Sequence, residues 1–175
     1  VPLDALYKCW HIYPRTDMRY YTADLITEIL SGGGSSRLFQ ALVKEKQLFS
    51  NIDCYHLGST DAGLLTISGK LIKGVKMEDA EAAVNEELIK LQQDGISQRE
   101  LDKVINKTES MIAFEDMSVT NRAASLAMYE LMGDADLINK ELDRYRAVTA
   151  DEIKKECKII FDEKNTNTLY YYSNN

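Results

Sequence analysis

The chain has 175 residues, of which 45% are hydrophobic, and a formal net charge of −7 at pH 7. This length and composition allow a substantial core and favour a single domain over residues 1–175. The negative charge argues against nucleic acid as a partner, because phosphate binding needs a concentrated basic surface. No apolar run is long enough to cross a bilayer, so we expect a soluble protein without a membrane partner.

The first residues, Val1-Pro2-Leu3-Asp4, include neither an initiating methionine nor the charged and apolar regions of a signal peptide. We therefore interpret the chain as a fragment of a longer one. Targeting signals would lie outside it, and the sequence leaves the compartment unknown.

The first half of the chain predicts a strand, two helices and a strand pair. Residues 6–13 are rich in aromatic and branched side chains and stop at Pro14, which predicts a strand. Glycines then separate two helical patterns, and 51–57 and 64–72 predict antiparallel strands joined by a polar turn. The expected buried helix positions are Met18, Tyr21, Leu25 and Ile29 in the first helix and Leu38, Leu42 and Glu45 in the second.

The second half is mostly helical. A buried stripe ends near Gly95, and capping boxes at Ser97 and Thr149 each begin a new helix. Two more helices are expected over 121–132 and 136–145, and 169–172 predicts a last strand. We expect four methionines to fill the core of this region: Met111, Met117, Met128 and Met132. The order of elements predicts an α+β fold, a largely antiparallel sheet with helices packed on one face.

The cysteines and histidines do not predict a metal site. Cys9, Cys54 and Cys157 are odd in number and lack CxxC spacing, which favours three separate thiols. His11 and His56 are far apart, so no pair of histidines one helical turn apart can form. We expect no catalytic residue, no metal and no cofactor in this segment.

The most informative motif is a glycine hinge, Gly32, Gly33 and Gly34, followed by Ser35, Ser36 and Arg37. Glycines permit backbone angles closed to other residues, and a serine can cap the helix that follows. The main interpretation is a structural break between two packed helices, with a substrate-facing hinge as the next. A phosphate-binding loop is disfavoured because the Gly-Lys-Ser/Thr signature is missing.

This hinge with Ser-Ser-Arg-Leu-Phe-Gln, the strand pair, and the late Arg-Tyr-Arg-Ala-Val-Thr-Ala-Asp-Glu-Ile segment at 144–153 resemble the second, non-catalytic domain of the pitrilysin family of zinc metallopeptidases. Insulin-degrading enzyme and mitochondrial processing peptidase belong to that family. The resemblance implies zinc on an N-terminal partner domain or subunit, held by an inverted His-x-x-Glu-His helix. It also implies a peptide substrate in a chamber between paired domains.

The family's non-catalytic domain often supplies an arginine and a tyrosine that hydrogen-bond the substrate near the scissile bond. The matching substrate-binding positions here are Val43 and Ser50, and both lack the required group. Lys44 or Tyr55 could replace the missing arginine or tyrosine only if the backbone brought its side chain to the matching position. The sequence thus favours a supporting domain of a zinc metalloendopeptidase, with a peptidase-inactive interaction or assembly scaffold as the alternative.

Overall fold

The computed structural model of the protein describes residues 3–58 and 60–174. The first part contains β1 (Ala5–Ile12), α1 (Arg19–Ser31), the π-helical turn η1 (Phe39–Glu45), β2 (Phe49–Leu57) and β3 (Gly63–Leu71). The second contains α2 (Met77–Asp94), α3 (Gln98–Glu115), α4 (Val119–Leu131), the 3-10 helix η2 (Ala135–Lys140), α5 (Glu141–Arg146), α6 (Ala150–Ile160), the 3-10 helix η3 (Glu163–Asn165) and β4 (Thr166–Tyr171).

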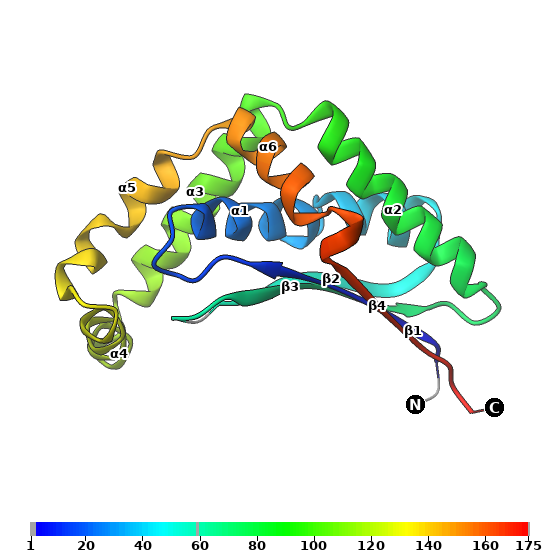
Figure 1. Ribbon diagram of the computed structural model, residues 1–175, viewed down its shortest axis with the longest axis horizontal. Coiled ribbons are helices and arrows are strands. Elements are labelled where there is room, and N and C mark those ends of the chain that lie inside the picture. The colour runs from blue at the N-terminus through cyan, green and yellow to red at the C-terminus, as the bar shows by residue number, and fades with distance from the viewer. Residues whose placement is uncertain (1–2, 59, 175) are drawn as a thin grey trace.

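Within the described residues, four strands form one antiparallel sheet in the order β2-β3-β1-β4. Helices α1, α2 and α6 lie over one face of this sheet, and the opposite face carries no helix (Figure 1). The two ends of the chain lie side by side, because Ala5 pairs with Tyr171 and Ser173 donates to the Asp4 carboxylate at 2.8 Å. The predicted α+β fold with helices on one face is confirmed.

Strand alternation positions the core. Trp10 pairs with Leu65 and Lys8 with Ile67, so these side chains share the face that the helices cover. In α1, Leu25 is fully buried together with Tyr21 and Ile29, as the helical spacing predicts. The sheet and the helices therefore share one continuous hydrophobic core.

Two residues expected in the core lie at the surface instead. Met18 is 49% exposed because it precedes the first turn of α1, and Glu45 is exposed at the end of η1. In η1, Lys46 N–H donates to the Ala41 carbonyl, a five-residue step that changes which side chains turn inward.

The prediction that the methionines fill the core is wrong. Met111, Met117 and Met128 are 47%, 78% and 42% exposed, and Met132 is half-buried. These methionines lie along the end of α3 and in and around α4, and α4 lies beyond the edge of the sheet (Figure 1). The expected helix over 136–145 is also divided into η2 and α5.

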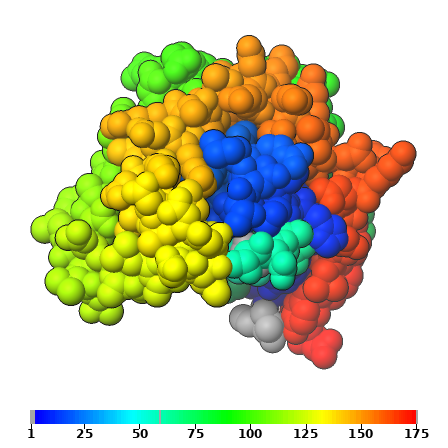
Figure 2. Space-filling model, turned by 60° about the vertical axis from the view of Figure 1, so that its left-hand side comes forward, coloured from blue at the N-terminus to red at the C-terminus, as the bar shows by residue number. Residues whose placement is uncertain are grey.

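The segment from α4 to the start of α5 attaches to the turn before α1 through a polar contact. Arg15 donates to the Glu141 carboxylate at 2.7 Å and to the Tyr129 hydroxyl at 3.3 Å. Figure 2 shows this segment, in yellow-green and yellow, beside the blue turn that precedes α1. Among the described residues, no helix is both long and apolar enough to span a membrane.

Candidate functional site

The glycine hinge forms a loop after α1, which we call the glycine loop (residues 32–36). Two of its positions favour glycine. Gly32 N–H donates to the Glu28 carbonyl at 2.8 Å, and a Cβ on Gly32 would lie 2.4 Å from that oxygen. Gly33 has a φ of +111°, a conformation that other residues rarely adopt. Its amide donates to the Ser31 carbonyl at 2.6 Å and its carbonyl accepts from Ser36 at 3.0 Å. The loop is thus a compact turn.

Two lysines of α3 fasten this loop. Lys107 donates to the Gly32 carbonyl at 2.9 Å, and Lys103 donates to the Ser35 hydroxyl at 2.6 Å. Neither serine caps the next helix, since Ser35 is engaged by the lysine and the buried Ser36 hydroxyl has no partner among the described residues. The loop's contacts with α3 favour the structural interpretation over a phosphate cradle.

Arg37 connects the loop to the junction of α2 and α3. Its Nε and Nη2 donate to the two Glu100 carboxylate oxygens at 2.9 and 2.8 Å, and Nη2 also donates to the Gly95 carbonyl at 2.9 Å. The hydrogen bond to Glu100 raises the pKa of Arg37. The capping box predicted at Ser97 is half formed, because Ser97 accepts from the Glu100 amide while the carboxylate turns to Arg37.

The two positions matched to the family's arginine and tyrosine flank the connection from η1 to the edge strand β2. Val43 is half-buried against the core, and the Ser50 hydroxyl donates to the Lys70 carbonyl at 3.1 Å across a bulge. Lys44 lies 5.8 Å from the Phe39 ring centroid. Tyr55 is 42% exposed on the uncovered face of the sheet. A substrate contact at Val43 and Ser50 stays a prediction.

The histidines do not fit a zinc ion. His11 is opposite Leu64 and His56 is opposite Leu65, so they lie on opposite faces of the sheet with β3 between their strands. Among the described residues, no group of three or more histidine, cysteine, aspartate or glutamate side chains is arranged to hold a metal. The three cysteines are free thiols, and burial raises the pKa of Cys157 to about 12.

Comparison with known proteins identifies the family. The family model of the peptidase M16 inactive domain matches residues 1–108. The chain belongs to this family. A relative in Bacillus subtilis, the uncharacterized zinc protease YmxG, is 25% identical over 146 residues, which cover 83% of this chain and 36% of that protein.

Solved structures show the same fold. A protease from Helicobacter pylori superposes with a TM-score of 0.92 at 18% identity, over 99% of this chain and 42% of that chain. The inactive peptidase domain of a zinc protease from Bordetella parapertussis superposes with a TM-score of 0.89 at 21% identity, over 99% of this chain and 92% of that chain. The chain therefore spans less than half of YmxG and of the Helicobacter protease chain, 36% and 42% respectively.

The chain also contains a partly buried polar cluster that the sequence did not reveal. His56 Nε2 lies 2.6 Å from one Asp24 oxygen, and the Tyr145 hydroxyl donates to the other at 2.5 Å. Burial is the main cause that raises the pKa of Tyr145. His56 Nδ1 is buried without a hydrogen-bond partner among the described residues.

This cluster joins β2, α1 and α5, and its Tyr145 belongs to the late segment of the family resemblance. Arg144, beside Tyr145, donates to the Tyr21 hydroxyl at 2.9 Å, and Thr149 forms a complete capping box with Glu152. The cluster pairs a histidine with a carboxylate, but its hydrogen bonds include no serine or cysteine nucleophile. Its hydrogen bonds hold α5 against α1 and β2. The only sequence signal for it was the Arg-Tyr pair itself.

Proposed function

We propose that residues 1–175 form one non-catalytic domain of a zinc metallopeptidase, which forms part of the wall of a peptide-binding chamber and docks to the zinc-bearing domain. The observation that carries the proposal is the match of the M16 inactive-domain model to a fold whose histidines do not fit zinc. The chain spans only 36% of YmxG, so the remainder of such a protein has room for a catalytic half.

In this proposal the peptide-facing segment runs from η1 into the edge strand β2. Val43 offers an apolar, half-buried surface, and the Ser50 hydroxyl is engaged with the Lys70 carbonyl. Neither side chain offers a free donor that could polarise a scissile carbonyl. The segment would therefore shape the chamber, and the zinc domain would supply the chemistry. A zinc ion on that partner would polarise the carbonyl and activate the attacking water.

The test is reconstitution with the zinc-bearing domain, whether it is encoded in the same polypeptide or in a separate subunit. We expect residues 1–175 alone to leave a quenched fluorogenic peptide intact. Adding residues 1–175 to the zinc domain should increase the rate of peptide cleavage at least about tenfold. A chelator should abolish this cleavage. Chelator-sensitive cleavage by residues 1–175 alone would refute the proposal.

The alternative is a scaffold that binds its partner without proteolysis, and the absent donors at Val43 and Ser50 favour it. The double variant Val43→Arg, Ser50→Tyr separates the two functions, with Met117→Arg as an exposed control. In a chamber wall, the double variant changes the kcat/KM of the assembly and the control does not. In a scaffold, partner binding persists and no variant yields cleavage.

A further inference from the structure

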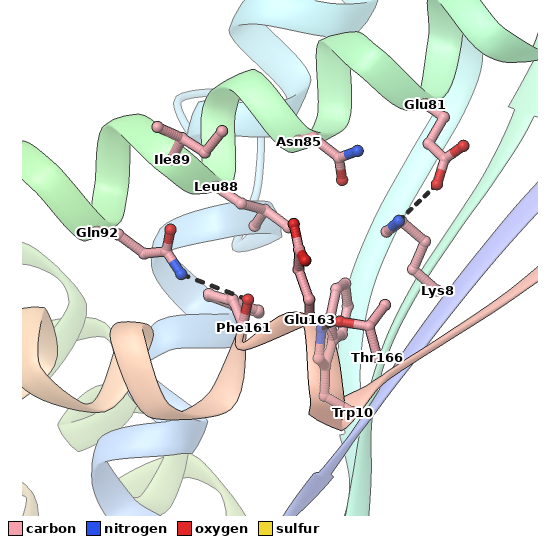
Figure 3. Close-up of a pocket in the computed structure, with 10 residues that line it drawn as sticks. All are labelled: Lys8, Trp10, Glu81, Asn85, Leu88, Ile89, Gln92, Phe161, Glu163 and Thr166. Atoms are coloured by element: carbon pink, nitrogen blue, oxygen red, sulfur yellow. Dashed lines mark hydrogen bonds and ion pairs between the residues drawn. The ribbon is translucent and has the colours of Figure 1, made fainter.

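A groove of about 460 Å³ lies between α2 and the strands β1 and β4, away from the glycine loop and β2 (Figure 3). We call it the α2–β4 groove. Its floor is apolar and includes the buried rings of Trp10 and Phe161. Its rim is polar and includes Glu81 and Asn85 from α2 and Glu163 from η3.

The one cation of this lining is already neutralised. Lys8 Nζ, on a side chain only 6% exposed, lies 2.7 Å from the Glu81 carboxylate and 3.2 Å from the Thr168 hydroxyl. Glu81 also accepts from the Tyr170 hydroxyl at 2.7 Å. Burial would raise the pKa of Glu81, but the hydrogen bonds from Lys8 and Tyr170 outweigh it and lower that pKa. Lys8 and Glu81 are therefore a paired structural element.

Two polar side chains of the rim are not paired. Asn85 and Glu163 make no side-chain hydrogen bond or ion pair with other described residues. Figure 3 shows both of them projecting into the space between α2 and the sheet. With Lys8 paired to Glu81, the Glu163 carboxylate leaves the groove with an excess negative charge. An apolar floor beneath an unpaired carboxylate fits a basic side chain, whose aliphatic stem packs while its charged end reaches the rim.

The strand β4 beside the groove also has a free backbone edge. β4 is the last strand in the sheet order, so its outer edge has no strand partner among the described residues. Thr166, Thr168 and Tyr170 face the helix side, opposite Trp10, Lys8 and Leu6. An added strand would lie about 4.8 Å away and direct alternate side chains to that same side, beneath α2.

We propose that the α2–β4 groove binds an extended basic segment of a separate polypeptide. The segment pairs its backbone with β4 and inserts a lysine or arginine side chain toward Glu163 and Asn85. An acidic segment would meet Glu163 with like charge, and a neutral one would leave that carboxylate unpaired. The inference concerns this chain alone and does not depend on pairing with a zinc domain, so the two proposals can fail separately.

The probe is a blocked heptapeptide of alternating lysine and valine, titrated into ¹⁵N-labelled residues 1–175. We expect amide shift changes along Thr166–Tyr171 and along the α2 face that carries Asn85. A matched peptide with glutamate in place of lysine should bind at least about tenfold more weakly, since it replaces attraction by repulsion. A lysine peptide N-methylated at alternate amides should lose binding, because it cannot pair with a strand edge.

Glu163→Gln should weaken binding of the lysine peptide about two- to fivefold, and Glu163→Lys more strongly. Glu115→Gln, an exposed carboxylate on α3, is the control and should leave affinity unchanged. Circular dichroism checks that each variant is folded. Equal binding of the glutamate peptide, shift changes confined to β2, or wild-type affinity in Glu163→Lys would each overturn the proposal.

Discussion

Arg37 and Glu100 form a two-bond ion pair between residues that are 63 positions apart in the chain. The pair joins the glycine loop to the first turn of α3, and a third Arg37 hydrogen bond, to the Gly95 carbonyl, holds the C-terminus of α2 in the same place. The arginine of the glycine motif is therefore a structural connection between the loop, the end of α2 and the start of α3.

Arg37→Ala should lower the free energy of unfolding by about 1–3 kcal/mol, because Glu100 and the Gly95 carbonyl lose a charged donor. Arg37→Lys should recover only part of this, since an ammonium cannot form both carboxylate bonds in the same plane. Urea denaturation measures the difference. Arg122→Ala, on the exposed face of α4, is the control. An Arg37→Ala variant as stable as that control would contradict the assignment.

Gly33→Ala and Gly34→Ala should differ in stability although the residues are neighbours. Neither position has a heavy atom within 4 Å of an added Cβ, but Gly33 has a φ of +111°. We expect Gly33→Ala to cost about 1–2 kcal/mol from backbone strain alone. Gly34→Ala should stay within about 0.5 kcal/mol of wild type. Thermal unfolding of both variants decides this, and equal melting temperatures would refute it.

Tyr145 should make the fold sensitive to alkali. Its pKa is raised in the folded state, so above pH 10 the unfolded chain loses a proton that the folded chain retains. Stability must then fall as pH rises, by about 1.4 kcal/mol per pH unit for this group. Tyr145→Phe should remove that slope while costing about 1 kcal/mol at neutral pH, because Asp24 loses a donor.

Urea unfolding at several pH values between 9 and 11 measures this slope. Tyr172→Phe, which removes an exposed phenol, controls for the loss of a hydroxyl group. If Tyr145→Phe and wild type lose stability equally over this range, the hydrogen bond from Tyr145 to Asp24 does not govern the alkaline response.

Replacing a buried leucine by alanine should lower stability far more than replacing an exposed one. Leu25 in α1 is fully buried and Leu131 in α4 is 75% exposed. Leu25→Ala should cost about 2–5 kcal/mol through the cavity it leaves. Leu131→Ala should change stability by less than about 0.5 kcal/mol. Comparing the midpoints of chemical denaturation tests this, and a large loss in Leu131→Ala would mean that α4 is covered in solution.

Sequence patterns of short range predicted much of the fold. The strand expected over 64–72 forms as β3, and the glycine at 95 marked the end of α2, where its φ is +70°. The Thr149 capping box formed in full. These features depend on residues within one or two turns of each other, so local spacing contains the information. The prediction failed around α4, beyond the edge of the sheet, as for Met117 in the exposed turn between α3 and α4.

The candidate site was predicted less completely. The sequence located the glycine hinge and the substitutions at Val43 and Ser50. It did not predict which residues contact them. Lys103 and Lys107 reach the loop from α3, and Ser50 is occupied by a carbonyl of the adjacent strand. Such contacts arise when helices pack on a sheet, and no periodicity encodes them.

By itself, the sequence determined the order of elements, the buried faces of most of them and the lack of a histidine pair that could hold zinc on a helix. Only the tertiary structure decided which polar groups meet: Arg37 with Glu100, Asp24 with His56 and Tyr145, and Lys8 with Glu81. Periodicity reflects hydrogen bonding and burial between near neighbours, whereas these partners lie 32 to 121 residues apart and meet only when the layers pack.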